Sequence, residues 1–205
     1  MPQVTTLFFD LGGVLLTNAW DTGARKRAAA AFGLDYQEFQ TRHEMLKTAF
    51  ETGRLTLDDY VRKAIFHRPR PFSPEDFKAF MFSQSQLLGG GETLEWVRTL
   101  AAAGRYRLFT LNNESRELHE YRVRTFGLDA IFLAFFTSCY LGQAKPDEDI
   151  YLNALGIAHC PSERAVFIDD RALNVEPALA LGLNAVLYQD LDALRAYLKD
   201  HGVTA

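Results

Sequence analysis

Cysteine, long apolar runs and any excess of basic charge are scarce or absent in this sequence. Its 205 residues include two cysteines, Cys139 and Cys160, and no Cys-x-x-Cys pair. Two cysteines are too few for a disulfide framework or a structural zinc site. We therefore expect both to be buried or inert thiols in a reducing compartment. No apolar run approaches the ~18 residues of a membrane-spanning helix, so we expect no membrane partner.

The charge balance and the N-terminal residues argue against two further classes of protein. The net charge is −4, which argues against an extended surface for nucleic acid or for anionic membrane. The first residues lead into an apolar stretch without a basic segment or a cleavage site. We therefore expect no signal peptide and a cytoplasmic location.

The most informative stretch is Thr-Thr-Leu-Phe-Phe-Asp-Leu-Gly-Gly at residues 5–13. A short continuous apolar run is typical of a buried central strand in a parallel sheet. Asp10 would then lie at the carboxyl end of that strand, where open α/β sheets bind ligands. The two glycines allow the backbone to turn tightly and to approach a ligand closely. Asp10 is therefore a candidate nucleophile.

The rest of the chain divides into two patterns. Residues 19–88 are helical in pattern throughout, whereas helices and strands alternate after Gly91, which predicts βαβ units and a parallel sheet. The expected strands are residues 4–10, 105–111, 165–169 and 184–188, with a short one within 130–138. We predict an α/β fold with a doubly wound, Rossmann-like core of residues 1–16 and 89–205. A helical cap domain of residues 17–88 is inserted after the first strand, where it can close over a site.

Polar residues that could take part in catalysis or binding follow the expected strands of the core. They are Asp10, the amides Asn112 and Asn113, the loop lysine Lys145, and the pair Asp169 and Asp170. Carboxylates at the ends of two parallel strands repel one another unless a cation relieves them. Mg²⁺ prefers oxygen ligands and commonly combines one or two carboxylates with a substrate phosphate. A lysine adds a point charge for phosphate and an amide NH₂ donates to a phosphoryl oxygen, so the set suits phosphoryl transfer through an aspartate.

These stretches, in this order and spacing, resemble the haloacid dehalogenase superfamily of phosphohydrolases. The most specific matches are Gly-x-x-Lys-Pro-Asp at residues 142–147 and Phe-Ile-Asp-Asp-Arg-x-x-Asn at residues 167–174. Glu-Thr-Gly-Arg-Leu-Thr at residues 51–56 resembles a cap segment of the small sugar-phosphatase-like members. The resemblance covers the whole chain and points to the capped subgroup that resembles glucose-1-phosphate phosphatases and the N-terminal phosphatase domain of epoxide hydrolases.

The resemblance implies a set of metal ligands around the first strand. Asp10 is implied to be both nucleophile and metal ligand, and the backbone carbonyl of Gly12 a second ligand. Asp170 is implied to bind Mg²⁺ directly, and Asp169 directly or through water.

The remaining implied roles concern the substrate. Lys145 would stabilise the nucleophile and the transferring phosphoryl group, and Asn112 and Asn113 would donate to substrate. The implied activity is Mg²⁺-dependent hydrolysis of a small phosphorylated metabolite through an aspartyl-phosphate. We expect a monomer or a homodimer.

Two positions depart from the usual pattern of that family. Most of its phosphatases carry an aspartate two residues after the nucleophile as general acid and base, where this chain has Gly12. The second motif usually ends in Ser or Thr, where this chain has Asn112. General acid and base catalysis is typically worth roughly 10²–10⁴-fold, so slow turnover or a need for good leaving groups is expected. A branch resembling glucose-1-phosphate phosphatases carries the same Asp-Leu-Gly.

Two other functions remain open at this point. A 2-haloacid dehalogenase also lacks the second aspartate but needs no metal, and the pair Asp169 and Asp170 favours a metal. A catalytically weak or silent protein that binds a phosphate ligand would be consistent with Gly12 and Asn112.

Several other residues are interpreted as structural. The cap residues Trp20, Arg25, Phe50, Arg54 and Tyr60 are expected in its core or on a solvated face more often than in a site. The five histidines show no ligand spacing, and Asn174 either orients the metal site or caps a helix.

Overall fold

A five-stranded sheet forms the centre of the larger part of the molecule. The computed structural model describes residues 3–204. The strands are β1 (Thr6–Phe9), β2 (Arg107–Asn112), β3 (Ala134–Thr137), β4 (Ala165–Asp169) and β5 (Asn184–Leu187). Their order is β3-β2-β1-β4-β5, and every neighbouring pair is parallel. The predicted doubly wound α/β core is therefore confirmed.

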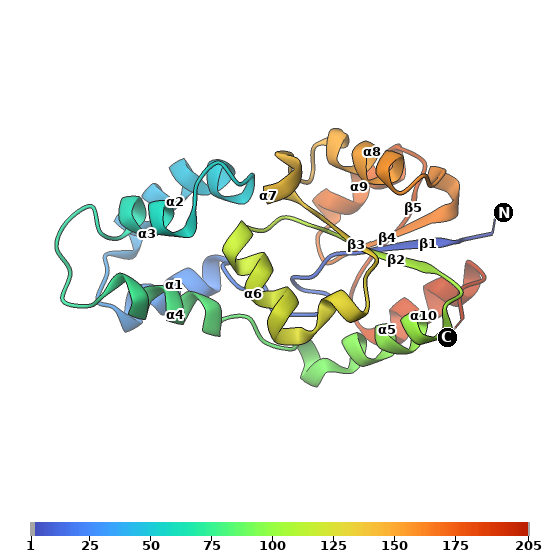
Figure 1. Cartoon of the computed structure of the whole chain (residues 1–205), viewed down its shortest axis with the longest axis horizontal. Helices are drawn as coiled ribbons and strands as arrows, with labels where there is room; N and C mark the ends of the chain where they lie inside the picture. Colours follow the sequence, from blue (N-terminus) through green and yellow to red (C-terminus); the bar gives the residue numbers. More distant parts are fainter. Residues whose placement is uncertain (1–2, 205) are drawn as a thin grey trace.

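Helices cover both faces of this sheet (Figure 1). One face packs against α5 (Glu92–Ala103) and α10 (Leu191–Asp200), and the other against α8 (Glu148–Ile157) and α9 (Ala172–Ala180). Helix α6 (Arg116–Phe126) follows β2 and lies between the sheet and the helices of residues 22–83 (Figure 1). Because both faces are covered, the central strands need apolar residues on both sides, which explains their continuous apolar runs.

Strand β1 illustrates how the sheet directs side chains. Leu7 and Phe9 belong to the cluster under α5 and α10, whereas Phe8 belongs to the cluster under α8 and α9. All three are buried, and full burial of such a side chain contributes roughly 1.5–3 kcal/mol. Strands buried this firmly fix the position of the residue that follows them, which in β1 is Asp10.

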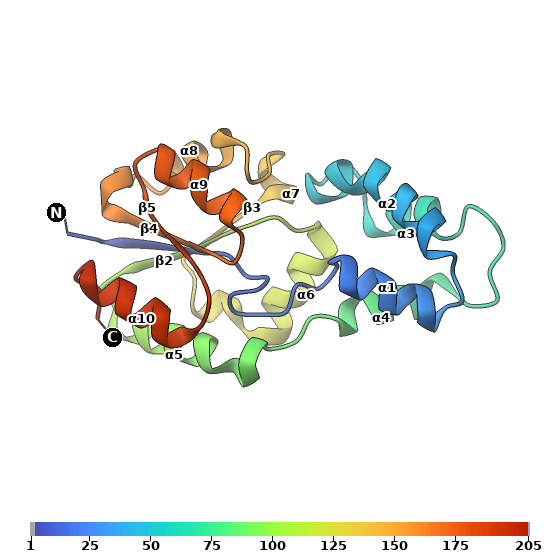
Figure 2. The ribbon, with the colours of Figure 1, turned by 180° about the vertical axis from the view of Figure 1, so that it is seen from behind.

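Four helices form a lobe beside the carboxyl end of the sheet, seen at the left of Figure 1 and from behind in Figure 2. They are α1 (Thr22–Ala31), α2 (Tyr36–Glu51), α3 (Leu57–Ala64) and α4 (Pro74–Ser83). We call these four helices and their connections the cap. Each helix follows an N-cap residue whose side chain accepts a hydrogen bond from a backbone N–H. These residues are Asp21, Asp35, Thr56 and Ser73. The cap has its own hydrophobic cluster, to which the core adds Leu118 of α6. Its division from the core as separate domains at residues 17 and 88 stays a prediction.

Some local elements differ from the sequence expectations. A single helical turn, α7 (Ser138–Leu141), follows β3, and three short 3₁₀ segments occupy Leu88–Gly91, Leu128–Ala130 and Ser162–Arg164. One turn carries no helical periodicity, so no sequence pattern predicted α7. Pro177 lies inside α9. Within residues 3–204 no helix combines the length and the apolar character that a bilayer crossing requires.

Candidate active site

Three aspartates meet where the order of the strands reverses. Asp10 follows β1, Asp169 ends β4, and the two strands are parallel neighbours. The backbone N–H of Asp10 donates to the carbonyl of Ile168 at 2.8 Å, which extends the ladder as far as the carboxylates. One carboxylate oxygen from each of Asp10, Asp169 and Asp170 lies within 4.8 Å of the other two. The topology thus places the cluster at the switch point of the sheet, where α/β proteins bind ligands.

Lys145 is the buried cation of this cluster. Its Nζ lies 2.6 Å from Asp169 Oδ2 and 3.1 Å from Asp10 Oδ1, and it also donates to the carbonyl of Leu111 at 2.8 Å. Its backbone is fixed by Asn113, whose Nδ2 donates to the Lys145 carbonyl while its Oδ1 accepts the Lys145 N–H. The amide of Asn113 therefore positions the lysine, and a contact of Asn113 with substrate stays a prediction.

The cluster carries more negative than positive charge. Burial raises the pKa of Asp10 to about 7 against the pull of Lys145, and Asp169 and Asp170 raise it further. Burial opposes the charged form of Lys145 too, but Asp10 and Asp169 outweigh it and raise the lysine pKa. The only other cation paired with these carboxylates among residues 3–204 is Arg171, whose exposed guanidinium has its Nε 3.9 Å from Asp170 Oδ1, so the three carboxylates still carry excess negative charge.

The donor set fits a divalent cation. All three carboxylates offer oxygen, the atom that Mg²⁺ prefers. Asp170 Oδ1 is buried and has no hydrogen-bond partner within residues 3–204, as expected of an oxygen that is kept for a ligand. Gly13 has a φ of 76°, and a Cβ there would come within 2.0 Å of Asp170 Oδ2. Glycine is thus required at 13, and it brings the backbone of Gly12 and Gly13 against the cluster.

Two amides flank the aspartates with different roles. Asn112 at the end of β2 is buried, its Oδ1 accepts from Thr137 Oγ1 at 3.2 Å, and its Nδ2 has no partner within the described chain. Such a free donor beside Asp10 suits an anionic ligand. Asn174 donates from Nδ2 to both oxygens of Asp169 at 3.0 Å, so it orients the cluster rather than capping a helix.

Asn18 occupies the space in which a side chain at position 12 would lie. A Cβ built on Gly12 would come within 2.6 Å of Asn18 Oδ1. The Nδ2 of Asn18 donates to Asp170 Oδ2 at 3.1 Å. An amide therefore lies where an ionisable group is expected, and no sequence pattern marks its position.

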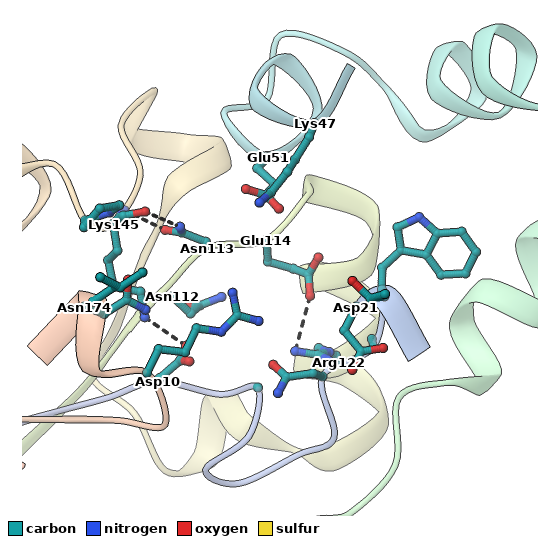
Figure 3. Close-up of a pocket in the computed structure, with 18 of the residues that line it drawn as sticks. Asp10, Asp21, Lys47, Glu51, Asn112, Asn113, Glu114, Arg122, Lys145 and Asn174 are labelled. Carbon is teal, nitrogen blue, oxygen red and sulfur yellow. Dashed lines mark hydrogen bonds and ion pairs between the residues drawn. The ribbon is translucent and has the colours of Figure 1, made fainter. Parts of the chain in front are cut away.

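The cluster opens into a cavity of about 380 Å³ between the core and the cap. Asp10, Gly12, Asn112, Asn113 and Lys145 all line it, so the structure brings the predicted residues together. Lining residues that were not predicted as part of a site include Asn18, Trp20, Asp21, Arg25, Lys47, Glu51, Glu114, Arg122 and Arg171. Figure 3 shows Lys47 and Glu51 reaching down from the cap toward Asn113 and Glu114. Trp20 and Arg25 pack in the cap and also line the cavity, whereas Phe50 and Tyr60 are buried in the cap as expected.

Glu114 and Arg122 form a buried ion pair on the wall of the cavity. Arg122 Nη1 lies 3.2 Å from Glu114 Oε2, and its Nη2 donates to the carbonyl of Thr17. Glu114 Oε1 accepts the N–H of Ser115 at 3.0 Å. Burial raises the pKa of Glu114, while Arg122 and the Ser115 bond lower it in part. Both oxygens of the Glu114 carboxylate therefore already have a partner in the wall of the cavity.

The cap touches the core beside this wall. Ser138 Oγ donates to the carbonyl of Glu51 at 2.6 Å and accepts the N–H of Glu114 at 2.9 Å. Gly53 has a φ of 74°, and a Cβ there would come within 2.2 Å of the Cys139 carbonyl oxygen. The end of α2 is therefore fixed against the core at the mouth of the cavity.

Fold and site together define a Rossmann-like α/β protein with a helical cap, whose acidic residues follow neighbouring parallel strands. The family model for haloacid dehalogenase-like hydrolases matches residues 4–182, and the chain belongs to this family. The resemblance expected from the motifs is thus confirmed, as is the expectation of an enzyme.

Three comparisons show which proteins the chain is similar to. It is 29% identical to flavin mononucleotide hydrolase 1 of Arabidopsis thaliana over 196 residues, which is 93% of this chain and 78% of that protein. It is 39% identical to bifunctional epoxide hydrolase 2 of Sus scrofa over 67 residues, 32% of this chain and 12% of that protein. A family enzyme from Bacteroides thetaiotaomicron, solved with magnesium and inorganic phosphate, superposes with a TM-score of 0.74 at 21% identity, covering 93% of this chain and 98% of that one.

Proposed function

We propose that this protein is a Mg²⁺-dependent phosphomonoesterase that acts on a small phosphorylated metabolite through an aspartyl-phosphate on Asp10. The observation that carries the proposal is the position of Asp10, which faces a cavity with Lys145 at 3.1 Å and two further carboxylates beside it. The likeness to a flavin mononucleotide hydrolase and to an enzyme solved with magnesium and phosphate supports it.

The residues of the cluster would divide the work of phosphoryl transfer. An Asp10 oxygen attacks phosphorus, and Lys145 favours the charged form of that carboxylate and adds positive charge beside the phosphoryl group. The free Nδ2 of Asn112 donates to a phosphoryl oxygen. These roles need no movement of the residues, because the ends of β1 and β2 fix Asp10 and Asn112, and hydrogen bonds from the backbone and Nζ fix Lys145.

The metal would be held by the oxygens of Asp10 and Asp170 and by the backbone carbonyl of Gly12. Asp169 is bonded to Lys145, Asn174 and the N–H of Arg171, so it supports the site directly or through water. When bound, Mg²⁺ neutralises charge on the phosphoryl oxygens.

The size of the cavity and its closure by the cap favour a small substrate. The lining mixes cationic side chains with the indole of Trp20. Flavin mononucleotide is therefore the first substrate to test, beside sugar phosphates and a generic aryl phosphate.

The direct test is release of inorganic phosphate from an aryl phosphate by the purified protein with Mg²⁺. We expect turnover that EDTA removes and that Asp10→Asn abolishes. The matched control is Asp192→Asn on α10, whose side chain is 95% exposed. An Asp10→Asn variant with full activity would overturn the role of Asp10 as nucleophile.

One observation favours a second candidate, a protein that binds a phosphate ligand without turning it over. Asn18 fills the place of the usual acid and base beside Gly12. Binding of phosphate and Mg²⁺ in calorimetry, with no turnover across a panel of phosphorylated metabolites, would support that reading over the enzyme.

A further inference from the structure

The proposed hydrolysis requires a proton donor that position 12 does not supply. In phosphoryl transfer the attacking and leaving oxygens lie roughly in line through phosphorus. With Asp10 attacking from the strand ends, the leaving oxygen points away from the sheet and toward the cap. Gly12 has no side chain, and the amide of Asn18 beside it has no proton to give as an acid. The donor must come from elsewhere in the cavity.

Outside the aspartate cluster, three carboxylates line the cavity, and two of them are engaged. They are Asp21, Glu51 and Glu114. Asp21 Oδ1 accepts the N–H of Ala24 at 2.7 Å as the N-cap of α1. Glu114 is held by Arg122 and Ser115, as described above. The carboxylate of Glu51 makes no hydrogen bond and no ion pair with any residue from 3 to 204.

Contacts with the core fix the backbone of Glu51, although its carboxylate has no hydrogen-bond partner among residues 3–204. It is the last residue of α2, and its carbonyl accepts from Ser138 Oγ at 2.6 Å. Two residues later, Gly53 lies so close to the Cys139 carbonyl that any side chain would collide with it. The cap therefore holds Glu51 over the cavity, where its carboxylate points toward the wall formed by Asn113 and Glu114 (Figure 3).

We propose that Glu51 is the general acid and base of this enzyme, in place of the residue missing at position 12. This inference rests on the proposed phosphatase function. In the first step the bond from phosphorus to the leaving oxygen breaks, the bond to Asp10 forms, and the Glu51 carboxyl proton passes to the leaving oxygen. In the second step water attacks phosphorus, its proton passes to the Glu51 carboxylate, and Asp10 is released together with inorganic phosphate.

The surroundings of Glu51 agree with this role. Burial raises the pKa of its carboxyl group, and Glu114 on the facing wall raises it further. Lys47 on the same helix, Arg171 of the core and Arg25 of α1 act in the opposite direction. A carboxyl group with a raised pKa keeps a larger protonated fraction near neutral pH, as a general acid must.

The test is Glu51→Gln assayed on two classes of phosphate ester. An alkyl phosphate such as glycerol phosphate has a poor leaving group and needs the acid, whereas para-nitrophenyl phosphate does not. We expect kcat on the alkyl ester to fall by roughly 10²–10⁴-fold and kcat on the aryl ester to fall less than about tenfold. The fall of kcat/KM for the alkyl ester at high pH should disappear in the variant.

The matched control is Glu44→Gln, an exposed glutamate on the same helix whose Oε1 accepts a hydrogen bond from Gln40 Nε2. It should leave both activities unchanged. Added formate should restore part of the alkyl activity of Glu51→Ala, and thermal unfolding checks that each variant is folded.

Two outcomes would overturn the assignment while leaving the proposed function intact. One is an equal loss on both esters in Glu51→Gln. The other is a high-pH limb that persists in that variant. A different result would contradict the proposed phosphatase function itself, namely an Asp10→Asn variant that remains active on the aryl ester.

Discussion

The side chain of Asn18 lies where a side chain on residue 12 would have to be. A Cβ on Gly12 would come within 2.6 Å of Asn18 Oδ1, and Asn18 Nδ2 donates to Asp170 Oδ2 at 3.1 Å. A side chain at position 12 therefore requires the Asn18 amide to shift. Restoring an aspartate there requires Asn18 to leave Asp170.

Gly12→Asp is expected to destabilise the protein by about 1–3 kcal/mol, because it costs the hydrogen bond from Asn18 to a charged group. Asn18→Ala alone loses the same bond. The double variant should therefore cost little more than Asn18→Ala, which is a strong departure from additivity. Urea denaturation without metal measures all three. Additive losses would show that Asn18 does not occupy the place in question.

Gly53→Ala should loosen the cap from the core. The new Cβ would come within 2.2 Å of the Cys139 carbonyl oxygen, and the φ of 74° disfavours any side chain. A clash with backbone has no cheap relief, so we expect a loss of about 2–4 kcal/mol. Gly33→Ala is the matched control, with a φ of 60° and no atom within 4 Å of the new Cβ.

The two glycine variants are separated by thermal unfolding and limited proteolysis. Gly33→Ala should cost about 1 kcal/mol, from its backbone conformation alone. Equal losses in the two variants would mean that the contact between Gly53 and Cys139 does not hold the cap.

The strand-end residues were predictable because their positions follow from burial of the strands. The limits of β4 were predicted to the residue, as its five buried residues end at Asp169. Lys145 and Asp170 followed from their motifs and from the rule that ligands bind at these strand ends.

The cap side of the cavity was not predictable in the same way. Lys47 and Glu51 lie four residues apart on α2, a spacing that is usual on a solvated helix face. Only the packing of the cap against Ser138 and Cys139 turns that face toward Asp10. Asn18 lies in the connection after β1, where no periodic pattern marks its contact with Asp170.

Mg²⁺ is expected to stabilise the folded protein through Asp170. A ligand that binds only the native state adds RT ln(1 + [L]/Kd), about 2.7 kcal/mol at 100 times Kd. Differential scanning calorimetry should show the melting temperature rising with Mg²⁺ concentration. Asp170→Asn should lose most of the shift, because the Oδ1 that accepts no hydrogen bond among residues 3–204 becomes part of a neutral amide. Asp192→Asn, at the exposed start of α10, should keep the shift in melting temperature. Loss of the shift in both variants would contradict a specific Mg²⁺ site at Asp170.

Histidine burial in the cap predicts a loss of stability in mild acid. His43 is buried, its Nδ1 lies 2.9 Å from Tyr60 Oη, and burial, with Arg25 and Lys47 nearby, lowers its pKa to about 3. Since the unfolded chain takes up this proton below pH ~6.5 and the native state does not, stability should fall as pH drops from about 6.5 toward 3. The slope is up to ~1.4 kcal/mol per pH unit.

Asp10 works in the opposite direction, because a carboxyl pKa raised to about 7 makes the native state bind the extra proton. The contribution of His43 must therefore be isolated by comparison. His43→Gln should be less stable than the wild type at pH 7, since Tyr60 loses its imidazole partner. The gap should narrow by about 2–3 kcal/mol between pH 6.5 and 4.5, because the variant has no histidine proton to exclude. Denaturant titrations at matched ionic strength measure this gap, and a constant gap would mean that His43 is protonated alike in both states.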